Sequence, residues 1–258
     1  MLLWASVHDR SPSWACQAEN WPDDLRPNPL PSQPTISRRS KTVEVLQLLA
    51  AVERLRSERP TEFALTVDAK PLTVGSYSRD PDTTWGHVPR GWGKGYKLHA
   101  IFASAAAPLE WEVEPINVAE PTVAARLVGR LKKGGGYVLG DGAYDSNPLH
   151  EIATFGGRQL LAPRKRPHAG LGHCRQTPGR LRSIELLEGP GEFGRTLHAE
   201  RDGVERRFGR LTNHAAGLAP LPNWVRRLDR VRLWIQLKLL IHTAYVLLKE
   251  HPPPIAHA

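Results

Sequence analysis

The 258-residue sequence has only two cysteines, Cys16 and Cys174, and one methionine. Two thiols exclude a disulfide framework and a four-cysteine zinc site, and the nearby histidines do not have zinc-ligand spacing. The sequence also lacks a Walker phosphate loop and a G-x-S-x-G nucleophile turn, so neither of those chemistries is indicated. Cysteine usage of this kind fits a reducing compartment, and we expect a cytoplasmic protein.

Long uncharged hydrophobic runs are also missing. The most apolar segment, 231–250, is interrupted by Arg232, Lys238 and His242, so it falls short of the ~18 uncharged residues of a membrane span. We predict a buried helix there and no membrane partner. The first ten residues have neither the basic start nor the long apolar stretch of a signal peptide.

Acidic residues are outnumbered. The chain has 35 Lys and Arg against 26 Asp and Glu, a formal net charge of +9 and a pI near 9.9. That balance attracts nucleic acid, anionic membrane or acidic protein. Segment 161–182 has six Lys and Arg and no acid. We predict phosphate contacts from Arg164, Lys165 and Arg166, with a merely solvated basic loop as the alternative.

The chain is divided here into three parts: residues 1–60, 61–250 and a disordered tail, 251–258. Residues 1–34 are rich in Pro, Trp and Asn and are predicted to be irregular. Residues 32–56 follow a helical apolar pattern. The start of this segment, "PSQPTISRR", resembles the recognition helix of a DNA-binding helix-turn-helix, and an ordinary capped helix is the alternative.

Residues 61–250 show alternating strand and helix patterns. Strands are predicted over 62–75, 96–104, 108–116, 136–145 and 158–164. Helices are predicted over 119–133, 147–156, 197–214 and 222–250, and loops over 76–95 and 165–195. Three successive strands favour antiparallel pairing, and the later alternation favours parallel pairing through helical crossovers. The fold class is therefore α/β: an RNase H-like mixed five-stranded sheet flanked by helices.

Two aspartates stand out against these strands. Asp68 interrupts the apolar strand "LTVDAKPL", and a buried carboxylate costs several kcal/mol unless it is paired or binds metal. Asp141 ends the fourth strand between two glycines, where open α/β sheets bind ligands. A strand-edge or turn role is the alternative for each. Asp145, four residues later, is a competing acid that could instead cap the next helix.

A third acid, Glu205, lies in "LHAERDGVERRFGRLTNH" and is the only acid between 203 and 214. Helical periodicity places it at the border of an apolar stripe, with Arg201 one turn before it. An ordinary surface ion pair is the alternative. In an RNase H-like sheet the first and fourth strands are adjacent and the late helix crosses them, so the three carboxylates would converge. Oxygen ligands of this kind suit two Mg²⁺ or Mn²⁺ ions acting on a phosphodiester.

The blocks "VDAKPL", "KGYKLHA", "PINVAE", "LGDGAYDS" and "ERDGVERRFGRL" occur in an order that resembles DDE transposases of the bacterial insertion-sequence type. The resemblance implies that Asp68, Asp141 and Glu205 are the catalytic metal ligands. It also implies a DNA-contact role for Arg201. His198 stands where the family block has Tyr, and is assigned the same role.

Two strand residues and one loop add further candidates for DNA contact. Lys97 and His99 share a strand face with Ile101 and are predicted to reach DNA, with a partly buried histidine as the alternative. Trp85 and Trp92 would stack on bases, unless they simply cover the edge of the core.

The resemblance implies a bacterial, nucleoid-associated enzyme that cuts element ends and joins a 3′-hydroxyl to target DNA. Its partners would be double-stranded DNA, as terminal inverted repeats and target, and a second copy of the chain in a homodimer. Two alternatives are a related RNase H-like nuclease and an inactive DNA-binding remnant.

Overall fold

The computed structural model describes residues 1–57, 62–103, 107–214, 216–218 and 220–250. The chain forms two compact units. One comprises Pro60–Arg210, and the other combines Met1–Arg59 with Leu211–Ala258. The predicted tail, 251–258, lies outside the described residues.

The sheet belongs to the Pro60–Arg210 unit. Its strands are β1 (Ala64–Val74), β2 (Thr84–Val88), β3 (Gly91–Phe102), β4 (Pro108–Pro115), β5 (Tyr137–Leu139) and β6 (Gln159–Leu161). The order is β2-β3-β1-β5-β6, and β4 also pairs with β3. β1 pairs antiparallel with β3, which pairs antiparallel with β2 and β4, whereas β5 and β6 add in parallel beyond β1. The predicted RNase H-like mixed sheet is thereby confirmed.

The sheet has one more strand than predicted. β2 lies within segment 76–95, which we expected to be a loop, and it forms a hairpin with the start of β3. Four glycines between residues 86 and 95 stand at positions where a strand usually has apolar side chains. The alternation of apolar and polar residues that predicts a strand is therefore missing. The prediction of five strands was wrong for this reason.

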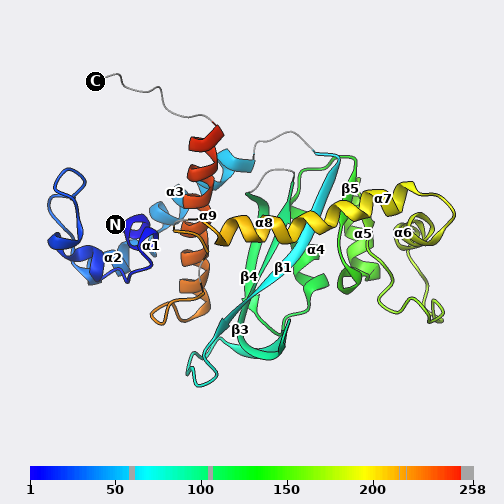
Figure 1. Ribbon diagram of the computed structural model, residues 1–258, viewed down its shortest axis with the longest axis horizontal. Helices are drawn as coiled ribbons and strands as arrows, with labels where there is room; N and C mark the ends of the chain where they lie inside the picture. Colours follow the sequence, from blue (N-terminus) through cyan, green and yellow to red (C-terminus); the bar gives the residue numbers. More distant parts are fainter. Residues whose placement is uncertain (58–61, 104–106, 215, 219, 251–258) are drawn as a thin grey trace. The chain divides into compact units, whose positions relative to one another are not determined.

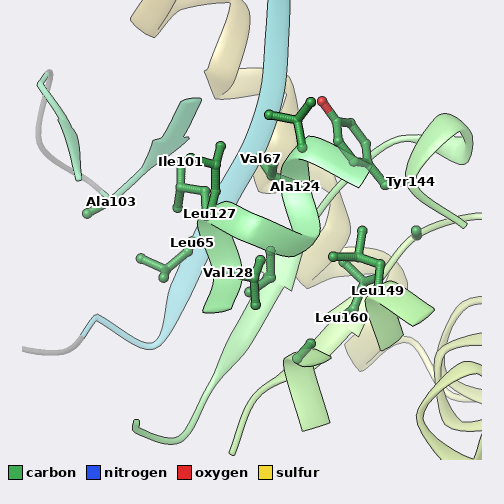
Figure 2. Close-up of a cluster of buried hydrophobic side chains, with 14 residues drawn as sticks. Leu65, Val67, Ile101, Ala103, Ala124, Leu127, Val128, Tyr144, Leu149 and Leu160 are labelled. Carbon is green, nitrogen blue, oxygen red and sulfur yellow. The ribbon is translucent and has the colours of Figure 1, made fainter. Parts of the chain in front are cut away.

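One face of the sheet is covered by α4 (Glu120–Arg130) and α5 (Asn147–Phe155). The buried side chains beneath them form the main core, drawn in Figure 2. They come from β1, β3, β5, β6, α4, α5 and the turn after β5, and include Leu65, Val67, Ile101, Leu127, Val138, Tyr144 and Leu149. Because Leu65 and Val67 face this core, the alternate residues of β1 point to the other face.

That other face carries α7 (Phe193–Ala199), a 3₁₀ turn η4 (Glu200–Asp202) and α8 (Gly203–Thr212) (Figure 1). Leu197 packs on Leu139 and Leu161, and Phe208 meets Phe102 edge-on at 5.0 Å. The predicted apolar stripe is buried, but the single helix predicted over 197–214 is interrupted by η4. The 3₁₀ turn changes the helical rotation between Leu197 of α7 and Val204 of α8.

A helix was missed in segment 165–195, which we expected to be a loop. α6 (Pro178–Glu188) packs against β6, α5 and α7. Its start has the features that favour a helix N-terminus: Thr177 accepts a hydrogen bond from Arg180 N, and Pro178 occupies the first helical position. The surrounding Gly, Pro and Arg residues hid this signal.

The second unit contains α1 (Leu2–Val7), 3₁₀ turns η1 (Trp14–Cys16) and η2 (Ala18–Asn20), α2 (Gln33–Arg39), α3 (Val43–Ser57) and α9 (Leu228–Glu250). Residues 1–34 are therefore not wholly irregular. The Trp4 and Trp21 rings stack at 4.9 Å, and their indole N–H groups donate to Asn20 O and Ala15 O, both at 2.8 Å. The helix predicted over 32–56 is divided between Arg39 and Val43, and the helix-turn-helix remains a prediction.

α9 packs with α1 and α3, so by contacts it belongs with the N-terminal segment. Over Leu228–Lys249 it is long and apolar enough to cross a membrane, a test that a buried core helix also passes. Lys238 is buried within this unit, where its Nζ lies 2.8 Å from Asp9 Oδ1 and donates to Ala216 O at 3.0 Å. A buried, paired lysine favours the core helix.

Candidate active site

Of the first two predicted acids, Asp68 lies in β1 and Asp141 lies two residues after the end of the neighbouring strand β5, which is shorter than the predicted strand 136–145. Thr66 of β1 pairs with Leu139 of β5 in parallel register. Asp68 and Asp141 each follow two residues later, and parallel neighbours are ~4.8 Å apart. Asp68 is on the same side of β1 as Thr66, which faces α8. The register of the sheet therefore brings together two carboxylates separated by 73 positions in the sequence.

The turn after β5 fixes Asp141. Its Oδ1 accepts a hydrogen bond from Ala143 N at 2.8 Å, capping the 3₁₀ turn η3 (Gly142–Tyr144). A Cβ at Gly140 would lie 3.0 Å from the Tyr144 side chain, so the close approach of that ring favours glycine. This explains the glycine before Asp141, and the hydrogen bond to Ala143 leaves Asp141 Oδ2 turned towards Arg201.

Arg201 connects the two aspartates. One of its terminal nitrogens is 3.4 Å from Asp141 Oδ2 and 3.9 Å from Asp68 Oδ2. Both are long for charge-assisted contacts, and Arg201 Nε is buried without a hydrogen-bond partner among the described residues. The guanidinium is therefore an incompletely satisfied cation between two carboxylates.

Asp68 has an unusual ionisation. Burial raises its pKa to about 6, and the nearby charges of Asp141 and Glu120 add to the effect. The Ala69 N–H, at 2.8 Å from Asp68 Oδ1, and the Arg201 cation oppose it without cancelling it. A buried carboxylate beside another carboxylate is a site at which a further cation would be stabilised.

His198 lies beside this pair. Its Nε2 is 2.9 Å from the carbonyl oxygen of Gly140, directly before Asp141. The contact joins α7 to the end of β5, so in this structure His198 helps to position the turn that carries Asp141. Its predicted contact with DNA remains a prediction.

The structure does not bring Glu205 into the same cluster. Its side chain is exposed on α8, one turn beyond Arg201. Arg207 on the same helix donates to Thr66 Oγ1 and so anchors α8 to β1. Among the described residues, no group of three or more His, Cys, Asp or Glu is arranged to hold a metal ion. The predicted trio is thus present as an adjacent pair with Glu205 apart.

Lys97 and His99 lie on the sheet face under α4, away from Asp68. Lys97 Nζ is 2.7 Å from Glu120 Oε1, and His99 is only 1% exposed. Burial, with the nearby Lys97 charge, lowers the His99 pKa to about 3, so its ring is neutral. In this arrangement neither side chain is available to a DNA backbone, and we leave both out of the proposed interface.

The three predicted phosphate contacts differ in their surroundings. Arg164 pairs with Glu188 at 2.6 Å and donates to Pro167 O and Ala169 O, so it holds its own loop together. Lys165 and Arg166 have exposed side chains. They remain candidates for contact with phosphate.

A buried ion pair near the site was missed from the sequence. Asp145 receives two hydrogen bonds from Arg180 of α6, both at 2.6 Å, and His150 Nε2 is 3.6 Å from Asp145 Oδ1. Burial alone would raise the pKa of Asp145, but bonds from Arg180, His150 and the Lys165 N–H hold it well below its usual range. This pair joins the end of the Asp141 turn to α6; it involves residues 35 positions apart, so only the fold reveals it.

Replacing Arg180 with alanine is expected to lower the free energy of unfolding by about 3–5 kcal/mol at pH 7, because Asp145 would be left buried and charged. The low pKa of Asp145 means that this stabilisation is complete above its unfolded pKa of ~3.9 and is lost as the pH falls below it. Urea unfolding at pH 7 and at about pH 2, well below the unfolded pKa, measures both effects. Arg182→Ala, on an exposed side chain of α6, is the matched control; an equal loss in that variant would contradict the assignment.

The mixed sheet, with Asp68 in β1 and Asp141 two residues after the end of its parallel neighbour β5, has the RNase H-like arrangement. The transposase DDE domain family matches residues 61–244, and the chain belongs to this family. Members of the family generally use divalent metal ions. No curated protein sequence matches the chain.

Among solved structures, the piggyBac transposase, in a synaptic complex with hairpin DNA, is similar over 96% of this chain. The sequence identity is 8% and the TM-score is 0.50, so the likeness concerns the fold. This chain covers 64% of that transposase chain, which is less than two thirds of its length.

Proposed function

We propose that this protein is the transposase of an insertion sequence, which hydrolyses phosphodiester bonds at the element ends and transfers the freed 3′-hydroxyl to target DNA. The observation that carries the proposal is the proximity of Asp68 and Asp141, which share the Arg201 guanidinium and each follow the last β1–β5 pair by two residues, in a member of the transposase DDE domain family. In this assignment the two acids are catalytic.

The residues present fit a hard divalent cation. Asp68 and Asp141 supply oxygen donors. Burial, with a smaller contribution from the charge of Asp141, raises the pKa of Asp68, and the long contacts of Arg201 do not cancel this effect. Such ligands suit Mg²⁺ or Mn²⁺. Glu205 is proposed as the third ligand, which requires its helix turn to approach the pair. When bound, two such ions would activate the attacking oxygen and stabilise the leaving oxygen of a phosphodiester.

The remaining groups act on DNA. Arg201, displaced from the carboxylates, would hold a phosphate by paired N–H donors. Exposed Lys165 and Arg166 would contact phosphates and set the position of the duplex without reading its sequence. The DNA partners are element ends and target, and two copies of the chain would hold two ends.

An assay with labelled element-end DNA, a target duplex and Mg²⁺ tests the proposal. A transposase cleaves the end and joins it to the target, and EDTA abolishes both reactions. Cleavage without joining would indicate a related nuclease. Binding without cleavage would indicate an inactive remnant, the alternative favoured by the separation of Glu205 from the aspartate pair.

A further inference from the structure

The β2–β3 hairpin, residues 84–95, carries large aromatic side chains that the protein does not cover. Trp85 is 52% exposed and Trp92 is 73% exposed. Indole rings are among the most apolar surfaces a side chain can present, and such rings are normally buried in a core or an interface. The sequence allowed these tryptophans either to stack on bases or to cover the edge of the core. The exposure of Trp92 favours stacking, and Trp85 keeps about half of its surface free for it.

Strand register places these rings on one face of the hairpin. Trp85 pairs with Lys94, and His87 pairs with Trp92, so the four side chains share a face, here called the indole face. The two tryptophans are diagonal neighbours across the strands, ~7–8 Å apart between backbones. Two bases of one strand could therefore be held at the same time.

The opposite face of the hairpin is built from glycine. Gly86 pairs with Gly93; a Cβ at Gly86 would lie 2.9 Å from the Ile116 side chain, and one at Gly93 would lie 3.0 Å from Val88. Thr84 and Val88 share this face, and at the two glycine positions between them a larger residue would crowd Ile116 or Val88. The bulky side chains are thus directed outwards by the fold.

The charge around the indole face matches a polyanion. Residues 84–109 contain no Asp or Glu, whereas Arg90 at the hairpin tip is exposed and Lys94 lies on the indole face. Lys94 Nζ donates to Ser78 O at 2.6 Å, which fixes its position close to the rings. Exposed aromatic rings with basic neighbours form the combination that binds single-stranded nucleic acid, in which bases stack and cations follow the backbone.

We propose that the indole face binds unpaired nucleotides of a DNA strand by stacking bases on Trp85 and Trp92. Bases inside a duplex already stack on one another, so only an unpaired base offers a free face. A second copy of this chain is the competing occupant. The hairpin itself carries basic and no acidic residues, and of the two acids just before it, Asp80 is buried and accepts a hydrogen bond from Tyr96, which favours nucleic acid.

The position of the indole face is compatible with the proposed active site. Lys94 pairs with Val74 of β1, and Val74 and Asp68 are six residues apart on the same side of that strand. At ~3.3 Å per residue, the separation is roughly 20 Å. A DNA strand cut at Asp68 and Asp141 would have its unpaired part within reach of the hairpin. This spatial relation rests on the proposed function, whereas the binding of unpaired bases to the indole face does not.

Fluorescence anisotropy with a labelled 15-nucleotide single strand and the matching blunt duplex tests the proposal. Measurements use the full chain in EDTA and at one fixed salt concentration, so metal-dependent chemistry cannot affect them. Trp85→Ala and Trp92→Ala are each expected to weaken single-strand binding by roughly 5- to 150-fold, with less than about a twofold change for the duplex. Trp92→Phe is expected to retain most of the affinity, because it keeps a ring.

Tyr77→Ala, whose side chain is 98% exposed in the preceding loop, is the matched control and is expected to bind like the wild type. Any of three results would overturn the proposal: no single-strand binding by the wild type, unchanged binding in both alanine variants, or equal losses for single strand and duplex. Sedimentation adds a fourth. A wild-type dimer that the alanine substitutions dissociate would identify a second copy as the occupant instead.

Discussion

Replacing Asp68 with asparagine is expected to lower metal-dependent DNA cleavage by about 10³-fold or more, while making the protein more stable at pH 8. A ligand that contributes several kcal/mol of charge stabilisation to the reaction corresponds to at least that factor. The gain in stability follows from the cost of ionising a buried carboxylate beside Asp141. Cleavage rates and urea unfolding measure the two effects separately.

The direction of the stability change follows from the pKa. The folded pKa of Asp68 is about 6, above the reference value of 3.8. The protonated Asp68 carboxyl contributes to the free energy of unfolding fully below pH ~4, and this contribution is lost as the pH rises through 6. Asparagine does not ionise, so the Asp68→Asn variant avoids that loss. Its free energy of unfolding is expected to exceed that of the wild type by up to about 3 kcal/mol at pH 8 and by almost nothing at pH 4.

Asp141→Asn is the matched comparison. Its side chain is 40% exposed, so we expect the same loss of cleavage without the gain in stability. If Asp68→Asn cleaved DNA at the wild-type rate, the proposed role of Asp68 would be wrong. A stability curve for that variant that stayed parallel to the wild type from pH 4 to 8 would contradict the burial argument.

Replacing Glu205 with glutamine is expected to lower cleavage by about 10²- to 10³-fold with no change in stability, because a proposed metal ligand is lost while its exposed side chain contributes little to the fold. DNA binding in EDTA should stay within about twofold of the wild type. The measurement is the cleavage rate at saturating Mg²⁺, together with thermal unfolding.

Two nearby exposed acids provide controls for Glu205. Glu200→Gln and Asp202→Asn change the charge by the same amount on the adjacent 3₁₀ turn η4. Both variants are expected to cleave at close to the wild-type rate. If all three substitutions had equal effects, Glu205 would act through general charge and not as a ligand.

The sequence was sufficient to predict the strand that carries Asp68 and the short strand after which Asp141 follows. An acid within an apolar strand, as at Asp68, and a glycine-flanked acid at a strand end, as at Asp141, are local signals. Their proximity follows from the parallel pairing of β1 with β5, which the alternation of strand and helix patterns indicated. The mixed sheet was predicted correctly for the same reason.

Other features depended on contacts that leave no local pattern. The Asp145–Arg180 pair joins residues from different elements, and Arg201, which contacts both aspartates, lies in the 3₁₀ turn between α7 and α8 that the sequence did not predict. The hairpin strand β2 was missed because Gly86 of β2 and Gly93 of β3 pack against Ile116 and Val88 in place of apolar side chains. Composition alone does not distinguish such a strand from a glycine-rich loop.

Anomalous diffraction from crystals soaked in Mn²⁺ tests the central claim most directly. The account predicts a peak between the carboxylates of Asp68 and Asp141, with the Arg201 guanidinium moved away from both. A map with no peak there at millimolar Mn²⁺, and with Arg201 still between the two aspartates, would contradict it.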